Sequence, residues 1–274
     1  MHSPSLGAVY VHPVKSLAAR AADQAVVEPW GLGGDRRWML IDGENRVVTQ
    51  RQLPCMAQLS AEPLADGGVS LSAPGSAPLT VGVPDQARTM TAELHRSKVE
   101  VVPASGEAHT WLGARLDAEV RLVHLDAPSH RRPVDPEFGR PGETVSFADG
   151  FPLLLTARSS LDALNALVAQ GDHPEEGPLP MDRFRPNVVV EGTAPWAEDG
   201  WKRIVIGEVA FRVVKPCGRC VITTTDQRTA ERGKEPLRTL ARHRREGKHL
   251  LFGQNLIPDG TGVIRVGDPV RVLG

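Results

Sequence analysis

Two cysteines separated by two residues are the side chains of this sequence best suited to chemistry. They lie in the run Pro216-Cys217-Gly218-Arg219-Cys220. Such a pair can supply half of a zinc site, form a redox-active dithiol, or provide one thiolate to a softer metal. It can also consist of two half-buried cysteines that only pack. The pair by itself leaves all four interpretations open.

A structural zinc site needs a second pair of ligands, and the sequence offers none with suitable spacing. The one other cysteine is Cys55, and His243 and His249 are separated by six positions, which is longer than the usual spacing of two zinc-binding histidines. Zinc is therefore the weaker metal hypothesis.

A thioredoxin-like dithiol lies where a strand turns into a helix, because the helix N-terminus lowers the pKa of the thiol. Here Cys220 opens the β-branched run 221–225, which predicts a strand instead. Arg219, between the two cysteines, favours the thiolate form that binds a metal already ligated by sulfur. These neighbours favour a thiolate ligand.

Short strands and a few helices must position these residues. The patterns predict helices over 105–113, from Ser159 to Gly171 and from Pro236 onward. They predict strands over 6–11, 37–41, 47–49, 68–72, 97–102, 119–125, 187–190, 204–206, 209–214 and 220–225, with two more within 262–274. We therefore expect an α+β, β-rich protein with a barrel-like core. Residues 126–150 contain four prolines and no periodicity, which predicts a long loop at a junction.

Composition excludes several classes of function. Lys and Arg number 32 against 33 Asp and Glu, so the net charge of -1 provides no general attraction to nucleic acid or anionic lipid. Aromatic residues make up 4%, too few for a base-stacking platform. We see no signal peptide and no apolar run of about 20 residues, so we expect a cytoplasmic protein without a nucleic-acid or membrane partner. A basic run from Arg238 to His249 is either a solvated face or a docking surface for an acidic electron carrier.

Several ordered motifs resemble the MOSC domain family (molybdenum cofactor sulfurase C-terminal). The C-terminal half contributes FADGFPLLLTARSSLDALN, DRFRPNVVVEG, PCGRCVITTTD, GKEPLRTL, LFGQNL and GVIRVGDPVRV. The N-terminal half contributes VHPVKSL, GGDRRWMLID and TQRQLPCMAQL, which are similar to the N-terminal β-barrel region of the same family. The resemblance covers nearly the whole chain. It implies a smaller N-terminal β-rich subdomain over residues 1–125 and a MOSC domain over 126–274.

The resemblance implies a molybdenum cofactor, Mo-molybdopterin, and a set of residues to hold it. Cys220 corresponds to the metal ligand and catalytic residue, whereas Cys217 corresponds to no ligand. The implied cofactor-binding residues are Lys15, Ser16, Arg36, Thr156, less clearly Ser159, Arg185, Asn187, Gly218, Arg219 and Asn255. Arg and Lys suit the doubly charged phosphate at the end of molybdopterin. Read without the resemblance, each of these cations is an ordinary solvated charge.

The implied activity is a molybdenum-dependent reduction of N-hydroxylated compounds such as hydroxylamines, N-hydroxylated bases and amidoximes. Bacterial relatives append a plant-type ferredoxin domain, whereas this sequence ends at Gly274 directly after the last motif. We therefore expect a separate electron donor, which could be a ferredoxin, a flavoprotein or a haem protein. Two other functions stay open: a non-catalytic carrier of the cofactor or of sulfur on Cys220, and a β-rich binding module without metal.

Overall fold

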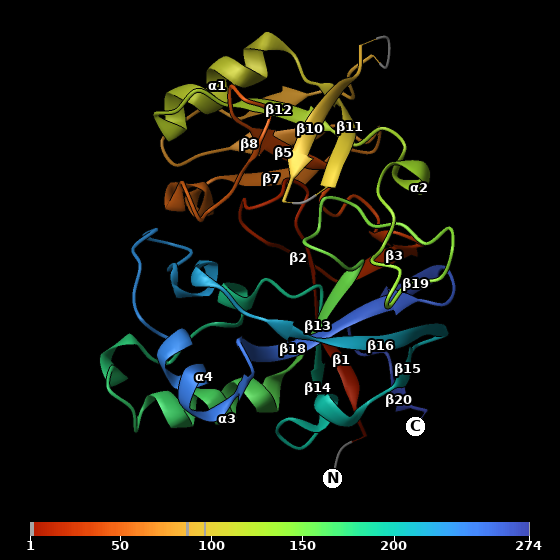
Figure 1. Ribbon diagram of the computed structural model, residues 1–274, viewed down its shortest axis with the longest axis vertical. Coiled ribbons are helices and arrows are strands. Elements are labelled where there is room, and N and C mark those ends of the chain that lie inside the picture. Colours follow the sequence, from red (N-terminus) through yellow and green to blue (C-terminus); the bar gives the residue numbers. More distant parts are fainter. Residues whose placement is uncertain (1–2, 86–87, 96, 274) are drawn as a thin grey trace.

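The computed structural model describes residues 3–85, 88–95 and 97–273. Figure 1 shows an upper lobe built from the first half of the chain and a lower lobe that contains most of the second half. The expected α+β, β-rich fold is confirmed, because strands dominate and the largest sheet curls into a half barrel.

The largest sheet has nine strands, eight of them in the order β2-β1-β14-β13-β18-β16-β15-β20, with β17 paired to β18. Their bounds are β1 (Ser5–Val11), β2 (Arg20–Ala22), β13 (Leu153–Ala157), β14 (Val188–Glu191), β15 (Arg203–Ile206), β16 (Val209–Gly218), β17 (Arg245–Glu246), β18 (His249–Pro258) and β20 (Val270–Val272). The first strand of the chain therefore lies between β2 and β14, inside a sheet that is otherwise mostly C-terminal. Leu6, Val9 and Val11 of β1 are buried in its core.

The upper lobe contains a five-stranded sheet in the order β10-β11-β12-β5-β6 and a small sheet β7-β8-β9. The bounds are β5 (Trp38–Ile41), β6 (Val47–Val48), β7 (Ser60–Pro63), β8 (Val69–Ser72), β9 (Leu79–Val81), β10 (Met90–Leu94), β11 (Ser97–Pro103) and β12 (Arg121–His124). A third small sheet pairs β3 (Gln24–Glu28) with β4 (Gly31–Leu32) and β19 (Gly262–Arg265). The two ends of the chain therefore meet in this sheet as well.

The helices are short and lie outside the sheets. Their bounds are α1 (Gly106–Leu116), α2 (Pro128–Arg131), α3 (Arg158–Val168) and α4 (Leu237–His243), with 3₁₀ helices η1 (Pro54–Gln58), η2 (Pro174–Glu176), η3 (Met181–Phe184), η4 (Ala197–Gly200) and η5 (Val221–Thr224). Ser105 caps α1 as expected, since its hydroxyl accepts from the Ala108 amide. In α3 the apolar face carries Leu161, Leu164 and Val168, all buried.

The strand predicted over 220–225 is wrong, because Val221–Thr224 form η5. The Thr223 hydroxyl donates to the Cys220 carbonyl at 2.8 Å, and the Thr224 hydroxyl donates to the Val221 carbonyl at 2.9 Å. These local bonds satisfy backbone carbonyls that a strand would pair with a neighbour, so they favour the turn over the β-propensity of the run. Cys220 consequently lies at the N-cap position of η5, not at the start of a strand.

The expected start of the second predicted helix is also corrected. Helix α3 begins at Arg158 with Ala157 as N-cap, so Ser159 lies inside the first turn. The Ser159 hydroxyl is 3.1 Å from the Thr193 hydroxyl and therefore does not cap the helix. The strands β13 and β18 were not predicted, although they form the centre of the large sheet.

The predicted loop over 126–150 contains one short helix, α2, and otherwise runs without regular structure between the lobes. Its last part is buried: Phe147 and Ser146 are completely covered. Arg132 donates to the carbonyl of Ser146 at 2.8 Å and so holds the loop against itself. The segment therefore forms a wall between the lobes, and its end lies at the pocket described next.

Candidate functional site

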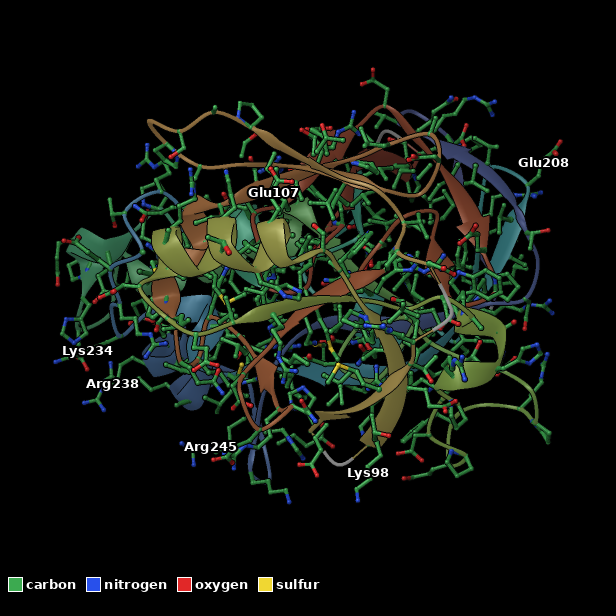
Figure 2. All side chains as sticks on the ribbon, turned by 90° about the horizontal axis from the view of Figure 1, so that it is seen from above. Lys98, Glu107, Glu208, Lys234, Arg238 and Arg245 are labelled. Carbon is green, nitrogen blue, oxygen red and sulfur yellow. The ribbon has the colours of Figure 1, made fainter. Side chains whose placement is uncertain are left out.

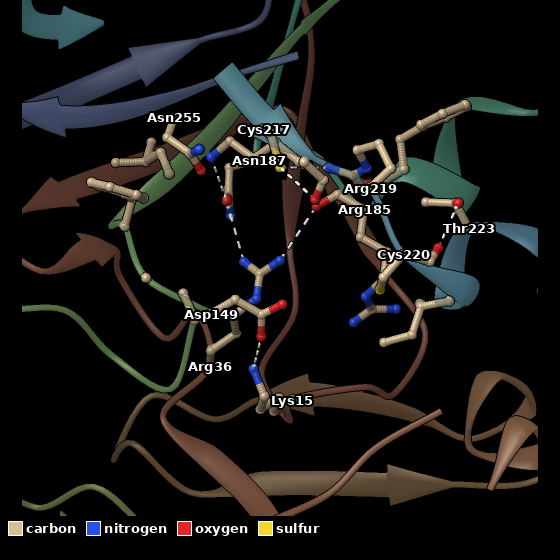
Figure 3. A pocket seen from close by; sticks show the side chains of 18 of the residues that line it. Lys15, Arg36, Asp149, Arg185, Asn187, Cys217, Arg219, Cys220, Thr223 and Asn255 are labelled. Carbon is tan, nitrogen blue, oxygen red and sulfur yellow. Dashed lines mark hydrogen bonds and ion pairs between the residues drawn. The ribbon is translucent and has the colours of Figure 1, made fainter. Parts of the chain in front are cut away.

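A pocket lies between the two lobes and draws its residues from both halves of the chain (Figure 3). Lys15 and Ser16 come from the turn after β1, and Arg36 precedes β5. The C-terminal half contributes the loop 148–151, the η3–β14 connection, the end of β16 and Asn255 of β18. The empty space measures about 730 Å³, a volume that includes open solvent at the mouth of the pocket.

Nine of the eleven residues expected at the site line this pocket: Lys15, Ser16, Arg36, Arg185, Asn187, Gly218, Arg219, Cys220 and Asn255. Residues separated by more than 200 positions are thus brought together by the fold. Thr156 and Ser159 do not line this pocket, so their role in binding the cofactor stays a prediction. Thr156 is a fully buried residue of β13 within the large sheet, and its hydroxyl donates to the Met181 sulfur at 3.2 Å. The hydroxyls of Ser159 and Thr193 are hydrogen-bonded.

The two cysteines are each approached by an arginine. Arg219 Nη1 lies 2.9 Å from Cys217 Sγ, and its Nη2 donates to the Phe184 carbonyl at 2.6 Å. Arg51 Nη2 lies 3.4 Å from Cys220 Sγ. Both sulfurs are partly exposed and belong to free cysteines. Each sulfur therefore lies within hydrogen-bond reach of a guanidinium.

Arg36 and Asn187 form the floor of the pocket by holding each other and the backbone. Arg36 Nη1 donates to Asn187 Oδ1 at 3.2 Å and to Asp35 Oδ2 at 2.5 Å, while its Nη2 donates to the Arg185 carbonyl at 3.3 Å. Asn187 Oδ1 also accepts from the Leu154 amide at 3.2 Å. The side chains are therefore fixed before any ligand arrives.

Arg185 is a buried guanidinium with no anionic partner of its own. It is 9% exposed, and within the described ranges neither Nη1 nor Nη2 has a hydrogen-bond partner. Burial, together with the positive charge of Arg36, lowers the pKa of Arg185 to about 9. A buried charge of this kind is costly unless something pairs with it. The pocket is therefore built to receive an anion at this point.

Lys15 and Asp149 form an ion pair on the opposite wall (Figure 3). Burial lowers the pKa of Lys15 to about 8, although the carboxylate of Asp149 opposes this shift. The desolvating pocket walls alone would raise the pKa of Asp149, but Lys15 and His95 hold it well below its ordinary value. Lys15 Nζ also donates to the Phe147 carbonyl at 2.8 Å, which fixes its direction.

Three of the eight side-chain-bearing residues with a positive φ in the described part of the chain line the pocket. Ser16, Arg36 and Arg185 have φ angles of 69°, 48° and 53°, in the left-handed region that side-chain-bearing residues rarely adopt. Such conformations cost free energy and persist where the surrounding structure enforces them, often at functional sites. This observation points to the same three residues as the pocket lining does.

Sequence reasoning missed two residues here, Arg51 and Asp149. Both lie in quoted motifs, TQRQLP and FADG, but nothing in their local spacing marks them as neighbours of Lys15 or Cys220. Asp149 contacts Lys15 and His95, and its Oδ2 lies 3.6 Å from Arg51 Nη2. Only the folded chain could reveal this cluster.

The basic run from Arg238 to His249 begins within α4, and three of its arginines form ion pairs on the surface. Arg238 and Arg242 both pair with Asp172, and Arg244 pairs with Asp199. Figure 2 shows Arg238 and Arg245 projecting from the outside of the molecule. These ion pairs favour the solvated-face interpretation for the first part of the run.

Comparison with known proteins gives the family. The MOSC domain model matches residues 142–271, and the model of the MOSC N-terminal beta barrel domain matches residues 3–119. The chain belongs to the MOSC domain family. The resemblance stated from the motifs is thereby confirmed.

Two kinds of MOSC relative are similar to this chain. Mitochondrial amidoxime-reducing component 1 of Homo sapiens is 31% identical over 97% of this chain and 82% of its own length, and that of Mus musculus is 30% identical over 97% and 81%. Molybdenum cofactor sulfurase of Danio rerio is 31% identical over 92% of this chain, but this match covers only 31% of that protein. None of the helices in the described ranges has both the length and the apolar character to cross a membrane.

Proposed function

We propose that this MOSC protein is a molybdenum cofactor-dependent reductase of N-hydroxylated compounds such as hydroxylamines, N-hydroxylated bases and amidoximes. The observation that carries the proposal is the pocket, in which a half-buried cysteine faces a group of buried cations that includes the unpaired Arg185. The proposal is supported by the similarity of this chain to mitochondrial amidoxime-reducing component 1 of Homo sapiens, which extends over 82% of that protein's length. We further propose a cytoplasmic location and a domain boundary near residue 125.

The residues of the pocket fit molybdopterin chemically. A terminal phosphate dianion would satisfy the free donors of Arg185, in a pocket that Lys15 and Arg36 also line. Asn187, Asn255 and the backbone of Gly218 offer neutral polar groups to a pterin edge. Cys220 offers a thiolate, a soft ligand that suits a metal already bound to sulfur.

The net reaction is R–NH–OH + 2 e⁻ + 2 H⁺ → R–NH₂ + H₂O. When bound, the cofactor supplies a molybdenum centre that takes up two electrons and passes them to the N–O bond. The protein contributes binding and orientation. Lys15, Arg36 and Arg185 would hold the anionic end of the cofactor, and Cys220 would ligate its metal. The electrons come from a separate ferredoxin, flavoprotein or haem protein.

The first test is the molybdenum and phosphorus content of the purified protein from a host with intact molybdopterin synthesis. We expect near-stoichiometric molybdenum in the wild type and in Cys217→Ser, and its loss in Cys220→Ala. Elemental mass spectrometry measures both elements. Wild-type protein without molybdenum, from a host that loads other molybdenum enzymes, would refute the proposal.

A carrier of the cofactor or of sulfur on Cys220 is the second candidate, because the chain is also similar to molybdenum cofactor sulfurase. The two candidates differ in turnover. A reductase consumes reduced methyl viologen in proportion to the N-hydroxylated substrate and releases the amine, whereas a carrier holds molybdenum without turnover. Reduction of the N-hydroxylated substrate by the purified protein with NAD(P)H as the sole reductant would contradict the need for a separate electron donor.

A further inference from the structure

Arg51 reaches the cysteine of the pocket from the other lobe. It lies in the connection between β6 and η1, and the carbonyls of Gln50 and Arg51 both accept from Arg232 Nη2, the second at 2.8 Å. The side-chain Nε2 of Gln50 donates to the Ser16 carbonyl at 2.9 Å and to Gln227 Oε1 at 3.1 Å. The segment that carries Arg51 is therefore held by contacts with both the N-terminal and the C-terminal half of the chain.

The guanidinium of Arg51 is only partly engaged. Its Nη2 contacts Cys220 Sγ at 3.4 Å and lies 3.6 Å from Asp149 Oδ2. In the part of the chain that the structure describes, no hydrogen bond is made by Nε or Nη1, and the side chain is 32% exposed. Arg51 thus presents free N–H donors at the open side of Cys220. A guanidinium offers five donors in a planar fork that matches oxygen acceptors.

We propose that Arg51 is the substrate-binding residue of this site and that it selects substrates with an oxygen acceptor next to the N–O group. A molecule that binds beside Cys220 Sγ comes within reach of this guanidinium, because Arg51 Nη2 lies 3.4 Å from that sulfur. Hydroxamic acids, with a carbonyl oxygen beside the N–OH, can accept from its fork. N-hydroxyguanidines, which are cationic when protonated, are repelled by it. This inference rests on the proposed function and extends it.

The kinetic test uses two substrates and reduced methyl viologen. We expect Arg51→Gln to raise KM for benzohydroxamic acid about tenfold to a hundredfold, because a charge-assisted hydrogen bond is lost, while KM for N-hydroxyguanidine falls or stays constant. Arg51→Lys keeps the charge but not the fork, so we expect an intermediate KM for benzohydroxamic acid. Rates are expressed per bound molybdenum.

The matched control is Arg46→Gln, which removes a guanidinium from the neighbouring turn, where Arg46 pairs with Asp42 and Glu44 away from the pocket. We expect this variant to keep the wild-type KM for both substrates. Molybdenum content and melting temperature are measured for all variants. If Arg51→Gln lowers molybdenum content while KM per molybdenum is unchanged, Arg51 only holds the site together and the proposal is wrong.

A binding test does not depend on turnover. The protein as purified is titrated calorimetrically with benzohydroxamate, and we expect Arg51→Gln to weaken the dissociation constant at least tenfold relative to both the wild type and Arg46→Gln. Equal affinity in all three proteins would overturn the proposal. If the wild type binds benzohydroxamate through Arg51 but never reduces it, the proposed function fails and this inference stands.

Discussion

At the scale of single residues, the unpaired Arg185 favours anion binding but lowers the stability of the protein without a ligand. Its guanidinium is buried without a partner in the described part of the chain, so the unloaded protein bears the cost of a desolvated charge. An anion removes this cost. A site of this kind is less stable when empty because it is already arranged for its ligand.

We therefore expect Arg185→Gln to stabilise the cofactor-free protein by about 1 to 3 kcal/mol while lowering its molybdenum occupancy. Chemical unfolding of protein from a host without molybdopterin gives the first quantity, and elemental analysis of protein from a competent host gives the second. The control is Arg183→Gln. Because Arg183 is paired with Asp226 at 3.1 Å, its loss destabilises the protein. A less stable Arg185→Gln protein would contradict the unpaired-charge interpretation.

A second residue-scale prediction concerns pH. Burial, followed by the charge of Arg36, lowers the pKa of His12 to about 3, and His12 lies against the buried Asp35. Below pH 6.5 the His12 imidazole therefore binds a proton in the unfolded chain but not in the folded chain. The free energy of unfolding consequently falls as pH falls from 6.5 toward 3. We expect His12→Gln to lose about 3 kcal/mol less than the wild type between pH 6.5 and 4. The exposed His243→Gln serves as control, and identical pH profiles for all three proteins would refute the assignment.

At the scale of elements, β18 depends on one glycine at its centre. Gly253 has a φ of +81°, and a Cβ there would lie 2.6 Å from the Leu155 carbonyl of β13. The clash involves backbone of the paired strand, which cannot move without disturbing the sheet that carries Asn255. The FGQN motif is therefore explained by a close approach of two strands.

Gly253→Ala should cost about 2 to 4 kcal/mol of stability, from the combination of strain and steric clash. Gly260→Ala is the matched control, because a Cβ at that position meets nothing within 4 Å. Thermal unfolding followed by circular dichroism compares the two. Equal melting temperatures would show that β18 tolerates the methyl group.

The elements also show what sequence could and could not predict. Helix α1 with its Ser105 cap and the apolar stripe of α3 were predictable, because local periodicity and capping determine them. Strands β13 and β18 were missed since strands buried in a sheet do not alternate, and η5 was missed because two threonine hydroxyls outweigh β-propensity. At the site, motif resemblance identified nine pocket residues, whereas Arg51 and Asp149 required the fold.

At the scale of the whole molecule, the pocket exists only where the two lobes meet. Lys15 and Arg36 come from the first matched domain, and Arg219 and Cys220 come from the second. Strand β1 also pairs with β14 inside the large sheet, and β3 pairs with β19. The two proposed domains therefore share a core, although they are distinct in sequence.

We expect residues 126–274 expressed alone to be poorly soluble and free of molybdenum. Removal of β1 leaves β14 as an open edge and exposes the apolar residues that face Leu6 and Val9. Size-exclusion chromatography and circular dichroism compare this piece with the full chain and with a chain in which only residues 1–3 are removed. A monomeric, cooperatively melting piece would show that the boundary near 125 separates independent folding units.

The position of β1 has a consequence for how the chain is made. Its partner β2 follows almost at once, but its other partner, β14, is synthesised roughly 180 residues later, which at 5 to 20 residues per second is a delay of about 10 to 35 s. During this time a hydrophobic strand with one unpaired edge is outside the ribosome and can pair with the wrong partner. A slower decoding rate between β2 and β14 would therefore reduce the yield of native protein more than the same slowing placed after residue 191.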